Sequence, residues 1–63
     1  MRIIVNGTER EVDEELPLTA LLPGKPQGTA VALNDTIVPR HRIGVVELAA
    51  GDRVEIVTAV QGG

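Results

Sequence analysis

The chain is predicted to reverse direction within its first eight residues. Ile3-Ile4-Val5 is a run of strand-forming residues, and Asn6-Gly7 follows it directly. Asn-Gly tolerates the two positive φ values of a type I′ turn, which joins adjacent antiparallel strands. We therefore predict a β-hairpin whose returning strand is Thr8 to Val12. That strand is mostly charged, so we place it at a sheet edge with one face in water.

A short helix is predicted after this hairpin. Pro17 suits the first helical turn, where its missing N–H costs nothing, and the acidic run 13–15 favours the positive end of the helix dipole. Three leucines share one inward face at helical spacing: Leu18, Leu21 and Leu22. Pro23-Gly24 is predicted to end the helix.

Three further strands are predicted from alternating residue types, at 29–33, 36–38 and 53–59. Turns are expected at Asn34-Asp35 and Gly51-Asp52, and residues 40–48 are expected to be irregular. The side chains predicted to face the core from these strands are Val31, Leu33, Val54 and Ile56. Val57 and Ala59 belong to the opposite face of the last strand, because side chains alternate along a strand.

A hairpin, one helix across one sheet face and further strands predict a small α+β roll. If the last strand pairs with the first, the apolar run Ile3-Ile4-Val5 is explained, because the first strand is then interior and covered on both faces. We expect a mixed sheet of four or five strands in a single domain spanning residues 1–60, followed by a flexible Gly-Gly tail at residues 61–63.

Composition excludes several functions. The 63 residues include no cysteine, one histidine and no aromatic residue. A disulfide scaffold, a cysteine nucleophile, a zinc site and base stacking on aromatic rings are therefore excluded. The net charge of −3 has the wrong sign for binding nucleic acid. No run approaches the ~18 apolar residues of a membrane span, and no secretory signal is present, so we expect a cytoplasmic protein.

Two charged clusters invite a catalytic interpretation. Glu9, Glu11 and the acidic run 13–15 offer paired carboxylates for acid–base work, and Arg40-His41-Arg42 offers a phosphate contact or a docking site. No Ser/His/Asp set, P-loop or metal-ligand spacing accompanies them. We therefore interpret both clusters as solvated surface and predict that the chain is not an enzyme.

The sequence ends on the pair Gly62-Gly63 directly after the last strand. Because glycine has no Cβ, an extended glycine segment fits a channel too narrow for any side chain. Residues 60–63 span at most about 13 Å, enough to bring the carboxylate of Gly63 into the active site of another protein. We predict that this carboxylate reacts. The predicted docking residues are Val57, Ala59, Val60, Gln61 and Gly62.

Two long stretches, Val31 to Arg40 and Leu48 to Gly63, resemble the thiamine-biosynthesis sulfur carrier proteins, the ThiS family. The specific parts are Leu-Asn-x-x-Ile-Val-Pro-Arg, Gly-Asp-Arg-Val-Glu and the terminal Gly-Gly, taken together. Asn6-Gly7 and the leucine helix also fall where that family has its first turn and helix.

This resemblance implies a ubiquitin-like β-grasp fold and a carrier without catalysis of its own. It implies that an ATP-dependent activating enzyme adenylates the carboxylate of Gly63, and that persulfide sulfur then replaces AMP to leave a thiocarboxylate. A thiazole synthase would take that sulfur for thiamine. The resemblance implies no bound cofactor, since the partner enzyme uses the ATP, and no contact with membrane or nucleic acid.

Other interpretations remain open at this point. The small subunit of molybdopterin synthase shares the fold and the tail, but is longer and carries a proline-rich approach to Gly-Gly. A sulfur carrier of another pathway or a ubiquitin-like tag would be activated in the same way and differ in the acceptor. A β-grasp module that only binds its partner would retain its activity without Gly62-Gly63.

Overall fold

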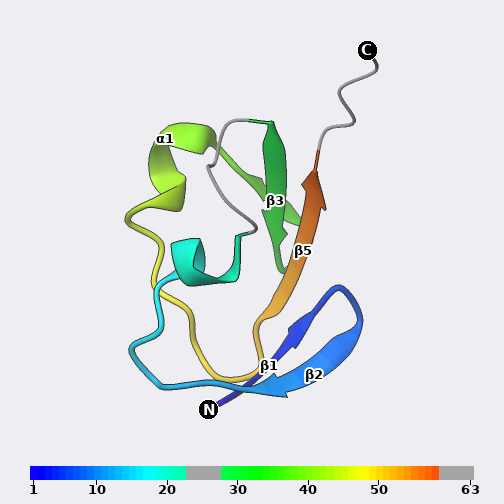
Figure 1. Cartoon of the computed structure of the whole chain (residues 1–63), viewed down its shortest axis with the longest axis vertical. Coiled ribbons are helices and arrows are strands. Elements are labelled where there is room, and N and C mark those ends of the chain that lie inside the picture. The colour runs from blue at the N-terminus through cyan, green and yellow to red at the C-terminus, as the bar shows by residue number, and fades with distance from the viewer. Residues whose placement is uncertain (23–27, 59–63) are drawn as a thin grey trace.

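The computed structural model describes residues 1–22 and 28–58. Five strands form one mixed sheet in the order β2-β1-β5-β3-β4 (Figure 1). The strands are β1 (Arg2–Val5), β2 (Thr8–Glu11), β3 (Thr29–Leu33), β4 (Thr36–Val38) and β5 (Arg53–Thr58). The first and last strands are parallel neighbours, and the other neighbours are antiparallel. The predicted pairing of the last strand with the first is confirmed, and β5 is the middle strand.

Each antiparallel hairpin turns through residues with positive φ. Asn6 and Gly7 join β1 to β2 with φ values of 49° and 82°, and Asn34 and Asp35 join β3 to β4 with φ values of 51° and 71°. Positive φ at both central residues is the type I′ pattern, whose twist matches that of the strands it joins. The prediction of a turn at Asn6-Gly7 is therefore confirmed in its backbone conformation.

The helical segments differ from the prediction. The segment after Pro17 is a single 3₁₀ turn, η1 (Leu18–Leu21), whereas the predicted short helix continued through Leu22 to Pro23-Gly24. Leu22 already has an extended backbone, with φ −83° and ψ 141°, because the proline that follows disfavours helical geometry at the preceding residue. The prediction that residues 40–48 are irregular was wrong at their start, where Pro39 caps the short α-helix α1 (Arg40–Ile43).

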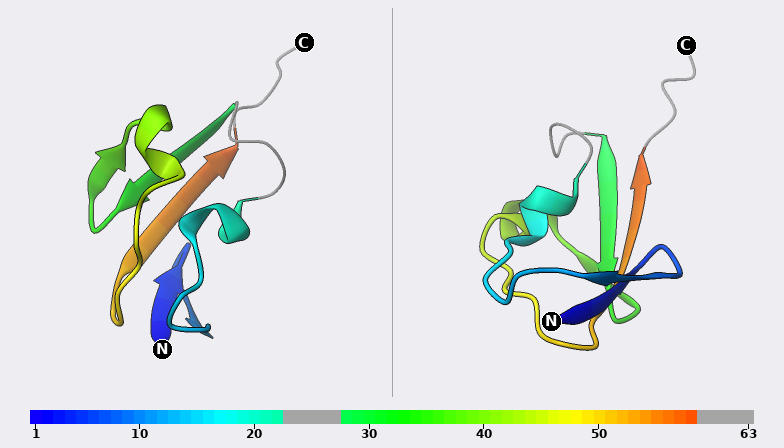
Figure 2. Two further views of the ribbon diagram at one scale, coloured as in Figure 1. Left: turned by 90° about the vertical axis from the view of Figure 1, so that its left-hand side faces the viewer. Right: turned by 60° about the horizontal axis from the view of Figure 1, so that its bottom comes forward.

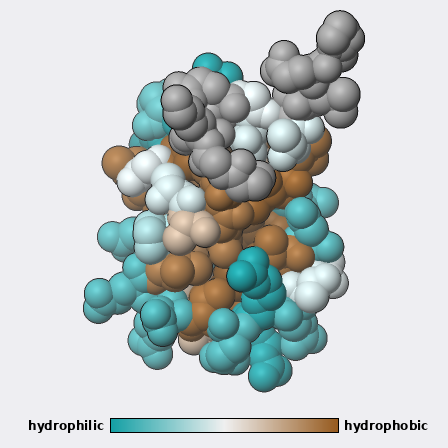
Figure 3. Space-filling view, viewed as in Figure 1, coloured by the Kyte–Doolittle hydropathy of each residue, from teal (hydrophilic) through white to brown (hydrophobic). Residues whose placement is uncertain are grey.

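Both helical segments lie on one side of the sheet (Figure 2). Seven buried apolar residues form the core between them and the sheet: Ile3, Val5, Leu18, Val31, Ile43, Leu48 and Val54. Figure 3 shows apolar side chains gathered in the middle of the visible face, with polar ones around its lower rim. None of the described helices is long and apolar enough to cross a membrane.

The opposite face of the sheet is open among the described residues. Ile4 is only half-buried, so the prediction that β1 is covered on both faces was wrong. Its neighbours Ile3 and Val5 point into the core, and Ile4 lies on the other face because side chains alternate along a strand. A strand that has neighbours on both edges is thus apolar throughout even though only one of its faces is covered.

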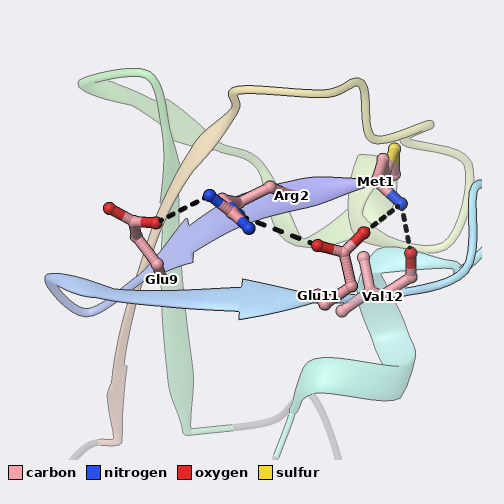
Figure 4. Close-up of polar contacts among 5 residues, drawn as sticks. All are labelled: Met1, Arg2, Glu9, Glu11 and Val12. Carbon is pink, nitrogen blue, oxygen red and sulfur yellow. Dashed lines mark hydrogen bonds and ion pairs between the residues drawn. The ribbon is translucent and has the colours of Figure 1, made fainter.

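The carboxylates of β2 act as ion-pair partners of β1 (Figure 4). Arg2 lies 3.5 Å from Glu9 and 3.7 Å from Glu11, and the Met1 amino group lies 3.2 Å from Glu11. The two glutamate side chains and that of Arg2 are about two-thirds exposed. Such surface pairs contribute at most about 1 kcal/mol each. This arrangement agrees with the interpretation of Glu9 and Glu11 as solvated surface.

Candidate functional site

The strand that leads to the end of the chain is the middle strand of the sheet. β5 has β1 along one edge and β3 along the other, and its last residue, Thr58, pairs with Thr29 of β3. The predicted site residues that follow lie outside the described residues: Ala59, Val60, Gln61, Gly62 and Gly63. The structure therefore describes β5 up to Thr58, the residue after which this segment begins.

Val57 is the predicted site residue that the structure describes. It is 63% exposed and lies on the open face of the sheet, so the predicted orientation away from the core is confirmed. Its partner across the strands is Ala30, and Ala32 pairs with Ile37 of β4 on the same face. Ala30, Ala32, Ile37 and Val57 thus share the open face of the sheet and form an apolar group, which we call the open-face patch; the exposed Glu55 of β5, which pairs with Ala32, lies on the same face and borders it.

Ile37 and the two alanines were not among the predicted site residues. Ile37 is 68% exposed, the largest exposure among the big hydrophobic residues of the described chain. The signal for these residues is the pattern Thr29-Ala30-Val31-Ala32-Leu33, in which the small residues occupy alternate positions. The pattern predicts which residues share a face of one strand, but the register that places Ile37 beside Ala32 requires the pairing.

A shallow hollow of about 320 Å³ adjoins the open-face patch near the end of β5. Its lining includes Ala30, Val57 and, from α1, Arg40. Arg40 was predicted to be part of a solvated loop. The structure finds it exposed, but on a helix and beside Val57, so a positive charge borders the apolar surface at the point where β5 leads toward residues 59–63.

The described residues offer surface for contact more than groups for catalysis. They contain no cluster of three His, Cys, Asp or Glu side chains with the geometry to hold a metal ion. His41, Arg40 and Arg42 are all exposed on α1. Within 1–22 and 28–58, every buried side-chain nitrogen or oxygen has a hydrogen-bond partner. What the geometry brings together is an apolar face, a bordering cation and the end of the middle strand.

Comparison with known proteins decides the family. The model of the ThiS family matches residues 3–63, which is nearly the whole chain. The chain belongs to the ThiS family. The crystal structure of the thiamine biosynthesis protein ThiS from Geobacter metallireducens superimposes with a TM-score of 0.80. It is 30% identical to this chain, and the match covers 100% of both chains. No curated protein sequence matches the chain.

Membership in the ThiS family confirms two predictions. The resemblance of Val31 to Arg40 and of Leu48 to Gly63 to thiamine sulfur carriers was correct. The predicted fold class, a ubiquitin-like β-grasp with a mixed sheet, is confirmed by the five-stranded sheet and by the similarity to the ThiS crystal structure.

Proposed function

We propose that this chain is a sulfur carrier of thiamine biosynthesis and a co-substrate of other enzymes. One observation carries the proposal: the match to the ThiS family extends to Gly63, and a solved relative described as a thiamine biosynthesis protein is covered over its full length. A carrier needs a binding surface and one reactive group, and the described region offers an apolar face for binding.

The proposed reacting group is the carboxylate of Gly63. A carboxylate is a poor acyl donor until its oxygen gains a good leaving group. In the proposed first step it attacks the α-phosphate of ATP on an activating enzyme, which releases pyrophosphate and forms an acyl adenylate. A persulfide sulfur then attacks the carbonyl carbon and AMP leaves. The product is an acyl disulfide with the cysteine that carried the persulfide. A thiol attacks the sulfur of that cysteine and forms a disulfide with it, which releases the thiocarboxylate of Gly63 for a thiazole synthase to consume.

In this proposal the surface that binds the partner and the atom that reacts are separated by the length of residues 59–63. The five residues after Thr58 span at most about 17 Å when fully extended. The body of the protein therefore docks outside a catalytic channel while the carboxylate of Gly63 reacts inside it. Gly62 and Gly63 carry no side chain that a narrow channel must accommodate. Gln61 and Val60 occupy the channel entrance in this proposal, and binding energy from the body positions the reacting atom.

The proposed contact with the activating enzyme is the open-face patch together with Ala59. Val57 and Ile37 are each more than 60% exposed and lie on the same face of the sheet, so both offer apolar surface that a partner could cover. The patch lies on the strand that continues into residues 59–63, so an enzyme that encloses the carboxylate of Gly63 also meets this face. Arg40 beside Val57 favours a partner surface with an acidic residue at the matching position.

The test measures the intact mass of the protein. The chain is incubated with its activating enzyme, ATP, a persulfide donor and a thiol reductant. We expect a mass gain equal to the difference between one sulfur and one oxygen atom. The matched control is a chain shortened by Gly62-Gly63, which keeps every described residue and is expected to gain nothing. An unchanged mass of the full chain under conditions that consume ATP contradicts the proposal.

The acceptor distinguishes the thiamine pathway from its alternatives. The thiocarboxylate form is offered to a thiazole synthase and, in parallel, to a molybdopterin synthase large subunit. Sulfur transfer to the first and not to the second is expected. The opposite result retains the carrier chemistry and moves the protein to the other pathway. Full activity of the shortened chain in its biological pathway would instead indicate a module that acts only by binding.

A further inference from the structure

The β1–β2 turn leaves the sheet before β5 ends. Asn6 donates its backbone N–H to the carbonyl of Val54 at 2.8 Å. In a regular parallel ladder, the backbone carbonyl of Asn6 would accept the N–H of Ile56, which lies two residues after Val54. The N–H of the residue two positions after Asn6 would then donate to the carbonyl of Ile56. The turn at Asn6-Gly7 carries both of these backbone groups away from β5, because the chain reverses there.

The side chain of Asn6 takes the place of both missing backbone groups. Its Oδ1 accepts the N–H of Ile56 at 2.8 Å, and its Nδ2 donates to the carbonyl of Ile56 at 3.3 Å. A carboxamide has one acceptor and a donor in one plane, as the peptide group does. The parallel ladder is therefore extended by one rung toward Thr58.

Asparagine meets two requirements at this position. The backbone of Asn6 has φ 49°, a conformation that asparagine and glycine adopt more readily than other residues. Glycine would adopt this conformation but has no side-chain carboxamide to form these hydrogen bonds. Aspartate would place a second acceptor oxygen against the carbonyl of Ile56, where a donor is needed.

Asn34 makes the corresponding contact at the other end of β5. It has φ 51°, donates its backbone N–H to the carbonyl of Arg53 at 2.8 Å, and accepts the N–H of Arg53 on Oδ1 at 2.9 Å. Its Nδ2 donates to Asp52 at 3.0 Å. Both asparagines are exposed turn residues with the same conformation. They differ in place, since Arg53 begins β5 and Ile56 is close to its end.

We propose that Asn6 is a positioning residue that fixes the direction in which β5 leads into residues 59–63. This inference rests on the proposed function of Gly63. Among the described residues, Ile56 is the last position of β5 that is bonded from the β1 side, and Asn6 makes both bonds. Without them the last rungs of β5 are held from the β3 side, through the pairs Ala30–Val57 and Thr29–Thr58. The end of the strand then pivots about one neighbour.

The experiment compares Asn6→Gly with Asn34→Gly. Both changes retain the backbone N–H and suit the positive φ, and both remove two side-chain hydrogen bonds. In Asn6→Gly we expect amide exchange at Ile56 to accelerate at least about tenfold relative to Val54, the preceding rung, because one hydrogen bond and its neighbour are lost. In Asn34→Gly we expect faster exchange at Arg53, with exchange at Ile56 changing only as much as at Val54.

The functional readout is the rate at which the activating enzyme consumes each variant. Asn6→Gly is expected to lower kcat by about three- to tenfold with KM within about twofold of the wild type, because docking is intact while the carboxylate is less often in place. Asn34→Gly is expected to have the kcat and KM of the wild type. If both asparagines acted only on overall stability, the kcat of each variant would fall in proportion to the stability that it loses.

The outcomes separate the two proposals. Unchanged exchange at Ile56 in Asn6→Gly overturns the extended ladder. Faster exchange with wild-type kcat, or an equal loss of kcat in Asn34→Gly, overturns positioning. If the wild-type chain is not converted at all, the proposed function fails and positioning fails with it, whereas exchange at Ile56 still shows whether Asn6 holds β5.

Discussion

Val57→Asp tests whether the open-face patch is the docking surface. Full burial of an aliphatic side chain of this kind contributes about 1.5–3 kcal/mol. Because Val57 is 63% exposed in the free protein, a partner that covers it gains about two-thirds of that amount, or about 1–2 kcal/mol. Loss of this contribution alone raises the Kd for the activating enzyme about 5- to 30-fold. Burial of the new carboxylate adds to the loss, so we expect a tenfold increase or more.

Val45→Asp is the matched control for this variant. Val45 is 66% exposed, so it has nearly the same exposed fraction as Val57, but it lies in the segment that follows α1 and not on β5. Binding to the activating enzyme is measured by titration calorimetry, and the folded state of each variant is confirmed by urea unfolding. Val57→Thr is a second variant, which retains β-branching and so separates lost binding from lost strand propensity.

Two results would refute the reasoning. If Val57→Asp is folded and binds as tightly as the wild type, then the exposed apolar surface at Val57 is not covered by the enzyme. If Val45→Asp weakens binding as much as Val57→Asp, the effect reports added negative charge on an acidic protein and not a local contact. An increase in Kd at Val57 with no change at Val45 supports the patch.

Three further predictions concern stability, measured as the free energy of unfolding in urea. Leu18→Ala is expected to lose about 3 kcal/mol, since Leu18 is fully buried and the cavity left by a buried leucine costs about 2–5 kcal/mol. A loss below about 1 kcal/mol would mean that Leu18 of η1 is not tightly packed in the core. Gly51→Ala is expected to lose about 1–2 kcal/mol because its φ is +87°, whereas Gly44→Ala, with φ −76° and equally open space, is expected to lose nothing. Arg2→Ala is expected to lose less than about 1 kcal/mol, and that loss should shrink in high salt.

The strands and turns followed from local chemistry, which is why they were predictable. Asn6-Gly7 and Asn34-Asp35 determine turns through the φ values they tolerate, and those turns were found with positive φ at both positions. The alternation in residues 29–33 and 53–59 assigned four side chains to the core: Val31 and Val54 are buried, and Leu33 and Ile56 are partly buried against the core. Each of these predictions depends on residues that are close together in the sequence.

The features that were not predicted depend on pairs of distant residues. α1 is a single turn, too short to show a helical period in the sequence. Its one buried residue, Ile43, belongs to the core because α1 packs against the sheet, which the local sequence does not indicate. The second face of β1 was assigned to the interior because Ile4 is apolar, although no described layer covers it. The bonds from Asn6 to Ile56 join residues 50 positions apart, so Asn6 was visible in the sequence only as a turn residue.

The candidate site divides in the same way. Val57 was predicted from alternation along one strand and is found on the open face. The β3–β4 register places Ile37 near Val57, and α1 places Arg40 there. Neither the register nor this helix could be predicted from the local sequence. The role of Gly63 and of residues 59–62 stays a prediction, since it was derived from the absence of side chains and from the family resemblance.

The place of β5 in the sheet explains how so small a protein can serve as a carrier. A domain of 63 residues has a total stability of about 3–9 kcal/mol, so it cannot rigidify every segment. The strand before the proposed reacting group is the middle one, bonded by β1 and Asn6 on one edge and by β3 on the other. Ordering of Val57 and Thr58 is thus achieved on folding and costs nothing when a partner binds. In the proposed function, the binding energy of the enzyme is therefore directed to the segment that carries the carboxylate of Gly63.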